Sequence, residues 1–131
     1  SSPMQLALVD YLATNRYDAH LRRLRRTLAE RKQQAWQSLL RHMPAGVKIH
    51  HNDSGYFLWL ELPEQLDAGR LSEKALTHQI SIAPGKMFST SNIWTPFFRF
   101  NTSWGWGERE EQAVVQLAGL IREMMLHPVT P

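Results

Sequence analysis

The chain has 131 residues, no cysteine and a formal net charge of +3, and 43% of its residues are hydrophobic. This length suits one domain with a modest core. The composition is ordinary for a soluble globular protein, and we expect a cytoplasmic location. Disulfides and thiolate chemistry are excluded, and no run approaches the roughly 20 apolar residues that cross a bilayer. Because the chain opens with Ser1 and not with methionine, we expect it to be a piece of a longer protein.

Two helices are predicted before the first strand. Residues 5–14 read as a short apolar helix, and Asn15 is a plausible stop or cap. From Arg16 to about Met43, apolar residues recur mostly at steps of three and four, which predicts a long amphipathic helix that ends at Pro44. Its apolar stripe is Tyr17, Leu21, Leu24, Leu28, Ala35, Leu39 and Met43.

Positive charge is concentrated in that long helix. Residues 16–41 carry eight Arg or Lys side chains against two acidic ones, a segment charge of +6, whereas the rest of the chain is −3. Such a stripe can attract phosphate backbones or can be the solvated face of an amphipathic helix. No base-reading motif accompanies it.

Short strands and one helix follow. Residues 47–50 predict a strand, and the nearly all-apolar run 56–62 predicts a central strand covered on both faces. Asp67 is placed to cap a helix that runs to about His78. The residues expected to face inward from that helix are Leu71, Ala75 and Leu76.

The last third predicts two more strands and a helix. Residues 79–83 read as a short strand stopped by Pro84, residues 97–101 as another strand, and 102–107 as a Trp/Gly-rich loop. Acidic residues after Gly107 favour the start of a final helix. Its expected inner stripe is Val114, Leu117, Leu120 or Ile121, and Met124 or Met125.

These elements predict an α+β fold of two layers, a small and mostly antiparallel sheet packed against helices. The expected organisation is an N-terminal helical segment at 1–15, the packed domain at 16–127 and a tail at 128–131.

Arg99 is the strongest candidate site residue, because it lies in the apolar strand Phe97–Asn101 between aromatic residues. Burying an unpaired guanidinium costs several kcal/mol, and its planar fork matches a carboxylate with two parallel hydrogen bonds. We therefore expect it to bind an anion, most simply the carboxylate of a small ligand. The alternatives are a surface-facing strand residue and an internal salt bridge.

Other chemistries have weaker signals. The six histidines are scattered without zinc-helix spacing, and no serine lies in a nucleophile elbow, so we expect no metal site and no catalytic residue. Lys86, after Pro84 and Gly85, could be a Schiff-base lysine, but a solvated loop lysine is the more ordinary interpretation.

Three motifs carry a family resemblance by their order and spacing. Asp53–Pro63 (DSGYFLWLELP), Ile82–Ser89 (IAPGKMFS) and Phe98–Asn101 (FRFN) resemble the C-terminal part of class I, fold type I, pyridoxal-phosphate aminotransferases. Tyr17–Arg26 (YDAHLRRLRR) resembles the start of the long helix that opens the small domain in one subgroup. That subgroup is the aminotransferase-like domain of the MocR-type transcriptional regulators of the GntR family.

The resemblance implies a division of labour. A large domain, which these residues do not include, would hold pyridoxal phosphate, and the small domain would supply the arginine that binds the α-carboxylate of an amino-acid-like ligand. That arginine corresponds to Arg99, and the residues that correspond to pocket-lining positions are Ser54, Gly55, Pro84, Gly85 and Phe88. Many relatives have Gly-Gly where this chain has Ser54-Gly55. The resemblance also implies a homodimeric parent that binds DNA through an N-terminal winged helix, and no cofactor on this piece by itself.

Three functions stay open at this point. The first is part of a ligand-sensing, aminotransferase-like regulator, which the Arg-Arg-x-Arg-Arg run favours by resemblance. The second is the small domain of a genuine aminotransferase. The third is a free-standing basic nucleic-acid-binding module, which predicts binding with a steep salt dependence.

Overall fold

The computed structural model describes the backbone of residues 3–51 and 55–127, and side chains from residue 13 onward within these ranges. Three α-helices occur in this part of the chain: α1 (Pro3–His42), α2 (Ala68–Leu76) and α3 (Glu108–Leu126). The four strands are β1 (Lys48–His50), β2 (Phe57–Glu61), β3 (Ala83–Pro84) and β4 (Phe97–Asn101). Two short 3₁₀ turns, η1 (Gly85–Met87) and η2 (Asn92–Trp94), fill the connection from β3 to β4.

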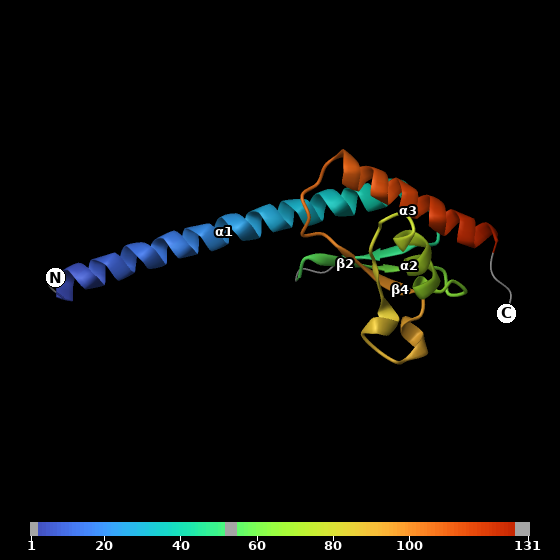
Figure 1. Cartoon of the computed structure of the whole chain (residues 1–131), viewed down its shortest axis with the longest axis horizontal. Helices are drawn as coiled ribbons and strands as arrows, with labels where there is room; N and C mark the ends of the chain where they lie inside the picture. The colour runs from blue at the N-terminus through green and yellow to red at the C-terminus, as the bar shows by residue number, and fades with distance from the viewer. Residues whose placement is uncertain (1–2, 52–54, 128–131) are drawn as a thin grey trace.

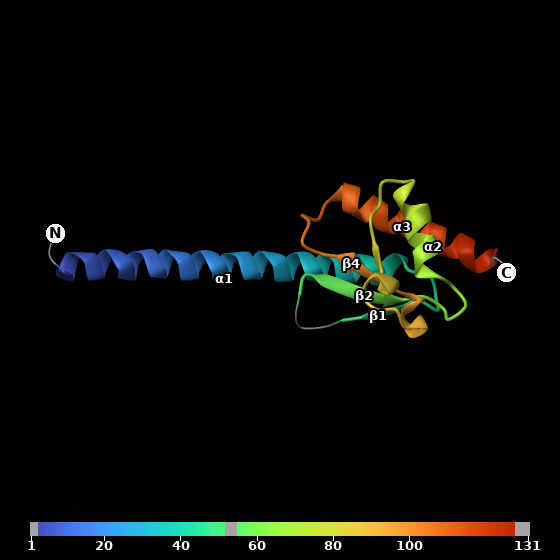
Figure 2. The ribbon, with the colours of Figure 1, turned by 60° about the horizontal axis from the view of Figure 1, so that its bottom comes forward.

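The four strands form one antiparallel sheet in the order β1-β2-β4-β3. Figures 1 and 2 show the sheet as one layer, with α1 and α3 lying side by side against it. The predicted α+β fold, with a small antiparallel sheet packed on helices, is therefore confirmed. The tail at 128–131 lies outside the described residues, and the predicted domain limits stay predictions.

The core lies between the sheet and the helices. Leu58 and Leu60 of β2 and Phe98 of β4 are fully buried, because alternate residues of a strand point to the same face. They pack in one cluster with residues of the helices, including Leu39 of α1 and Leu117 of α3. Leu117 belongs to the stripe predicted for α3, whose other members prove to be Val114, Ile121 and Met124.

The first two predicted helices are one helix, so the predicted stop at Asn15 is wrong. Asparagine is a weak helix former but tolerated in an interior, and nothing else in the segment breaks the helix. The N-terminal half of α1 extends away from the sheet in both views (Figures 1 and 2). Tyr17 and Leu24 are consequently exposed, whereas Leu28, Ala35 and Leu39, farther along the predicted stripe, are buried.

Two strand predictions also need correction. The strand expected at 79–83 is only Ala83–Pro84, and Pro84 belongs to it instead of ending it. Proline is tolerated there because β3 is an edge strand. The central strand β2 is covered by the helices on one face only, and its other face leaves Phe57 and Trp59 half-buried.

Helix α2 begins where the sequence predicts. The Asp67 carboxylate accepts a hydrogen bond from the backbone N–H of Gly69 at 2.7 Å, as an N-cap residue does. Leu71 and Ala75 are buried as expected, but Leu76 is 65% exposed because the helix ends there.

No helix in the described part of the chain is both long and apolar enough to cross a membrane.

Candidate functional site

Arg99 lies in the middle of β4, on the face of the sheet opposite the core. Its register partners are Trp59 of β2 and Ala83 of β3, so it is flanked by strands on both sides. The preceding residue, Phe98, points into the core, and alternation directs Arg99 to the other face, where it is half-buried. The guanidinium is therefore not in the helix-facing core, a position that would have contradicted a ligand-binding role.

Aromatic rings hold the Arg99 guanidinium in place. Its central carbon lies 3.7 Å from the ring centroid of Phe57 and 4.7 Å from that of Phe88. These distances are within the range of cation–π contacts. Within the part of the chain that the structure describes, Arg99 makes no hydrogen bond and no ion pair. Because the rings contact the faces of the guanidinium, the N–H groups at its edge are the groups left to bind a carboxylate.

A cavity of about 690 Å³ opens beside Arg99. Its lining brings together three of the six predicted site residues, Gly55, Phe88 and Arg99. Tyr56, Phe57 and Trp104 add aromatic surface, and Trp104 is 69% exposed. The sequence placed Trp104 only within the Trp/Gly-rich loop at 102–107, because no local pattern puts a loop residue beside the strand that precedes it.

Two other predicted site residues, Pro84 and Gly85, lie elsewhere. Pro84 pairs with Phe98 at the sheet edge, and Gly85 is buried where a Cβ atom would come within 2.6 Å of the Trp94 carbonyl oxygen. Neither lines the cavity beside Arg99. Ser54 lies outside the described residues.

Gly55 is required by its surroundings. It has φ of +81°, and a Cβ atom would lie 2.7 Å from the ring of Phe57, the ring on which Arg99 stacks. A side chain at this position would displace the aromatic support of the guanidinium.

Lys86 does not face this cavity. Its ammonium lies 3.7 Å from the Asp67 carboxylate, and it is not among the residues that line the cavity beside Arg99. No lysine lines that cavity in the described part of the chain. The lining of this cavity therefore does not fit pyridoxal phosphate by itself, and no step through that cofactor is assigned to this chain.

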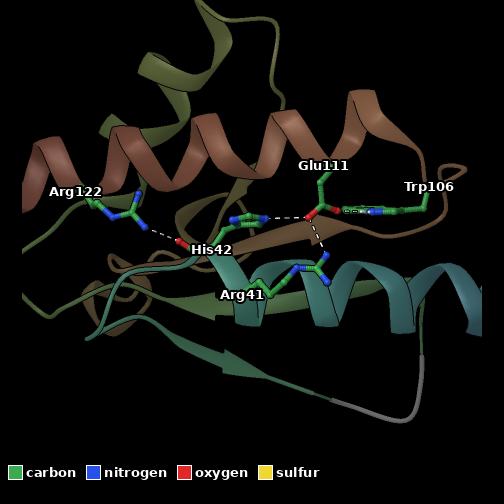
Figure 3. Close-up of polar contacts among 5 residues, drawn as sticks. All are labelled: Arg41, His42, Trp106, Glu111 and Arg122. Atoms are coloured by element: carbon green, nitrogen blue, oxygen red, sulfur yellow. Dashed lines mark hydrogen bonds and ion pairs between the residues drawn. The ribbon is translucent and has the colours of Figure 1, made fainter.

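A second polar cluster, around Glu111 of α3, was not predicted from the sequence. Figure 3 shows the Glu111 carboxylate accepting hydrogen bonds from Arg41 and His42 of α1 and from the indole of Trp106. The three donor–acceptor distances are 2.8, 2.9 and 3.0 Å. Arg122 adds a bond to the His42 carbonyl oxygen at 2.8 Å. The cluster ties the end of α1 to both ends of α3.

These donors lower the pKa of the Glu111 carboxyl from 4.5 to about 2. The hydrogen bond from Trp106 is the largest cause and that from Arg41 the next. Every bond goes to a protein group, so the cluster is an anchor between elements. The sequence signals were a basic pair ending α1 and an acidic first turn of α3, but 69 and 70 residues separate the partners.

Comparisons with known proteins identify the relatives of this chain. No protein family model matches it. It is 79% identical over 125 residues to the uncharacterized HTH-type transcriptional regulator YdcR of Escherichia coli; the match covers 95% of this chain and 27% of the regulator. The chain thus spans about a quarter of the length of this relative.

Two solved aminotransferases share the fold. The multiple substrate aminotransferase of Thermococcus profundus superposes with a TM-score of 0.78 at 25% identity, over 88% of this chain and 29% of that one. LysN, the α-aminoadipate aminotransferase of Thermus thermophilus, superposes with a TM-score of 0.76 at 26% identity, over 91% of this chain and 31% of that one. The LysN structure contains N-(5′-phosphopyridoxyl)-L-leucine.

These matches confirm the predicted resemblance and favour a regulator over a genuine aminotransferase. The chain has the fold of the small domain of aminotransferases, and its sequence is similar to that of HTH-type transcriptional regulators.

Proposed function

We propose that this chain is part of the ligand-sensing, aminotransferase-like domain of a cytoplasmic bacterial transcriptional regulator, and that Arg99 binds the carboxylate of an amino-acid-like effector. The observation that carries the proposal is the state of Arg99. Its guanidinium is positioned by Phe57 and Phe88 over a cavity, yet it has no acidic partner among the described residues.

The rest of the site lies outside this chain in the proposal. A large domain of the parent protein would hold pyridoxal phosphate, close the cavity beside Arg99 and form a homodimer. An N-terminal domain would bind DNA. The chain's own contribution is to orient one cation, to exclude water from it with aromatic rings and to offer its N–H edge to a carboxylate.

The test measures amino-acid affinity in the full-length parent protein by calorimetry, with α-amino acids and the cofactor as ligands. A bidentate, charge-assisted contact contributes on the order of 1.5–3 kcal/mol, so Arg99→Ala should weaken binding by about ten- to a hundredfold. Arg99→Lys keeps the charge but loses the fork, and should restore binding only in part.

A matched control is Arg70→Ala, an exposed arginine on α2 away from this cavity, which should bind as the wild type does. If Arg99→Ala binds the effector normally and is merely less stable, Arg99 is a structural residue and the proposal fails.

A further inference from the structure

A second cavity lies next to the Arg99 cavity, near the end of β4. It has a volume of about 370 Å³ and is bounded by Gln79 and Ile80 after α2, by Phe100 of β4 and by the first turn of α3. Phe100 follows Arg99 in the strand, so the two side chains leave the sheet on opposite faces. The volume is within the range of small-molecule sites, and every lining residue lies in the described part of the chain.

Aromatic side chains form one wall of this second cavity. Trp104 and Trp106 both line it, and the ring of Trp106 packs 6.5 Å from that of Phe100. Trp104 also lines the Arg99 cavity, as do Ser81 and Asn101, so the two cavities adjoin.

Hydrogen bonds tether the loop that carries this wall. The Trp106 indole donates to Glu111, and the Arg31 guanidinium donates to the Ser103 carbonyl oxygen at 2.8 Å. The Asn101 amide oxygen accepts two further hydrogen bonds from Ser103, at 2.8 and 2.7 Å. A wall tethered at both ends lowers the entropy lost when a ligand binds.

Two opposite charges face the same cavity without neutralising each other. Arg109 and Glu110 both line it, and within the described residues neither makes a hydrogen bond or an ion pair. Arg109 lies in the first turn of α3, where the helix dipole disfavours a cation. Local structure therefore accounts for the acidic residues of this turn but not for the arginine.

Gln79 is another lining residue that local structure does not explain. Among the residues that the structure describes, it is the only non-glycine with positive φ, at 63°. The bond from the Ile80 N–H to the Ala75 carbonyl oxygen at 2.9 Å shows that this conformation ends α2, a position where glycine is usual. The chain keeps a side chain here despite the strain, and that side chain lines the cavity.

We propose that this second cavity binds a small aromatic zwitterion of the amino-acid class. The carboxylate would bind Arg109, the ammonium would bind Glu110, and the ring would pack on Trp104 and Trp106. A ligand with both charges satisfies both side chains, whereas an anion or a cation leaves one of them unbound. Its two charged residues, Arg109 and Glu110, do not line the Arg99 cavity, so this proposal does not depend on the proposed Arg99 site.

The test is a titration of the isotope-labelled full chain with L-phenylalanine, followed through the indole N–H signals in NMR spectra. L-Phenylalanine adds no indole signal of its own. Saturable shifts of the Trp104 and Trp106 signals are expected. Phenylpropanoate lacks the ammonium and phenylethylamine lacks the carboxylate, and each should bind at least about tenfold more weakly than the amino acid.

Variants separate this site from its surroundings. Arg109→Gln and Glu110→Gln should each weaken binding by about tenfold or more, while the spectra show the fold to be intact. Glu108→Gln is the matched control, because Glu108 is in the same turn but does not line the cavity, and it should bind normally. Arg99→Ala should leave the saturable shift of the Trp106 signal unchanged, because Trp106 does not line the Arg99 cavity.

Three results would overturn the proposal. The first is the absence of a saturable shift at Trp106. The second is equal binding of the amino acid and its two singly charged analogues. The third is binding that shifts the Trp59 signal instead of the Trp106 signal and that disappears in Arg99→Ala. The ring centroid of Trp59 lies 5.9 Å from the central guanidinium carbon of Arg99. That result would place the amino acid in the Arg99 cavity and would support the proposed function alone.

Discussion

Arg99 and Glu111 are two charged side chains in opposite circumstances. Glu111 accepts hydrogen bonds from three protein donors. Arg99 contacts aromatic rings, and it makes no hydrogen bond or ion pair with any described residue. A charge whose bonds are all made within the protein stabilises the fold. A charge that is positioned but not neutralised is available to a ligand.

The sharpest test of this contrast compares the two side chains by stability. Glu111→Ala leaves the Trp106, Arg41 and His42 donors without their acceptor, and we expect the free energy of unfolding to fall by about 2–3 kcal/mol. Arg99→Ala removes mainly cation–π contacts and should cost about 0.5–1 kcal/mol. Urea unfolding followed by circular dichroism measures both.

Glu110→Ala is the control for that experiment. It removes the same charge from the same helical turn, but Glu110 makes no hydrogen bond within the described residues, so its effect should stay within about 0.5 kcal/mol. Equal losses in Glu110→Ala and Glu111→Ala would mean that the helix dipole, and not the three donors, accounts for the stabilisation.

The pH dependence of stability should report the same cluster. The pKa of Glu111 is lowered from 4.5 to about 2 in the folded chain, so the unfolded chain takes up this proton first as the pH falls. The stabilisation is complete above about pH 4.5 and is lost as the pH falls toward 2. Unfolding of wild type and Glu111→Gln should therefore differ most at neutral pH and converge near pH 2. A constant difference across this range would contradict the assigned pKa.

Lys86 is an intermediate case, with a partner at the longer distance of 3.7 Å and a half-exposed side chain. It does not line the Arg99 cavity, so we expect pyridoxal phosphate to label it no more than the other three lysines of the chain. Borohydride reduction followed by peptide mass spectrometry measures this. Stoichiometric labelling of Lys86 alone would show that this chain holds a cofactor site without a large domain.

Much of the fold could be predicted because its signals are local. The cap at Asp67 depends on a bond to a residue two positions away, and the stripe on α3 depends on a spacing of three and four. The predicted strand at 79–83 was wrong for a related reason. Its residues are apolar enough for a strand, but the left-handed turn at Gln79 and the packing of Ile80 and Ile82 into the core leave only Ala83 and Pro84 to pair with β4.

Some features of the candidate site could likewise be predicted from local sequence, and others could not. The sequence by itself determined that Arg99 lies in an apolar strand. Alternation along that strand places its side chain on the opposite face of the sheet from that of Phe98. Only the tertiary structure decided which rings hold its guanidinium, because Phe57 lies 42 positions earlier in the chain and reaches Arg99 through the antiparallel pairing of β2 with β4. The Glu111 cluster and the second cavity likewise join segments far apart in sequence. Such contacts depend on where the packed core brings distant segments together, and no local pattern encodes them.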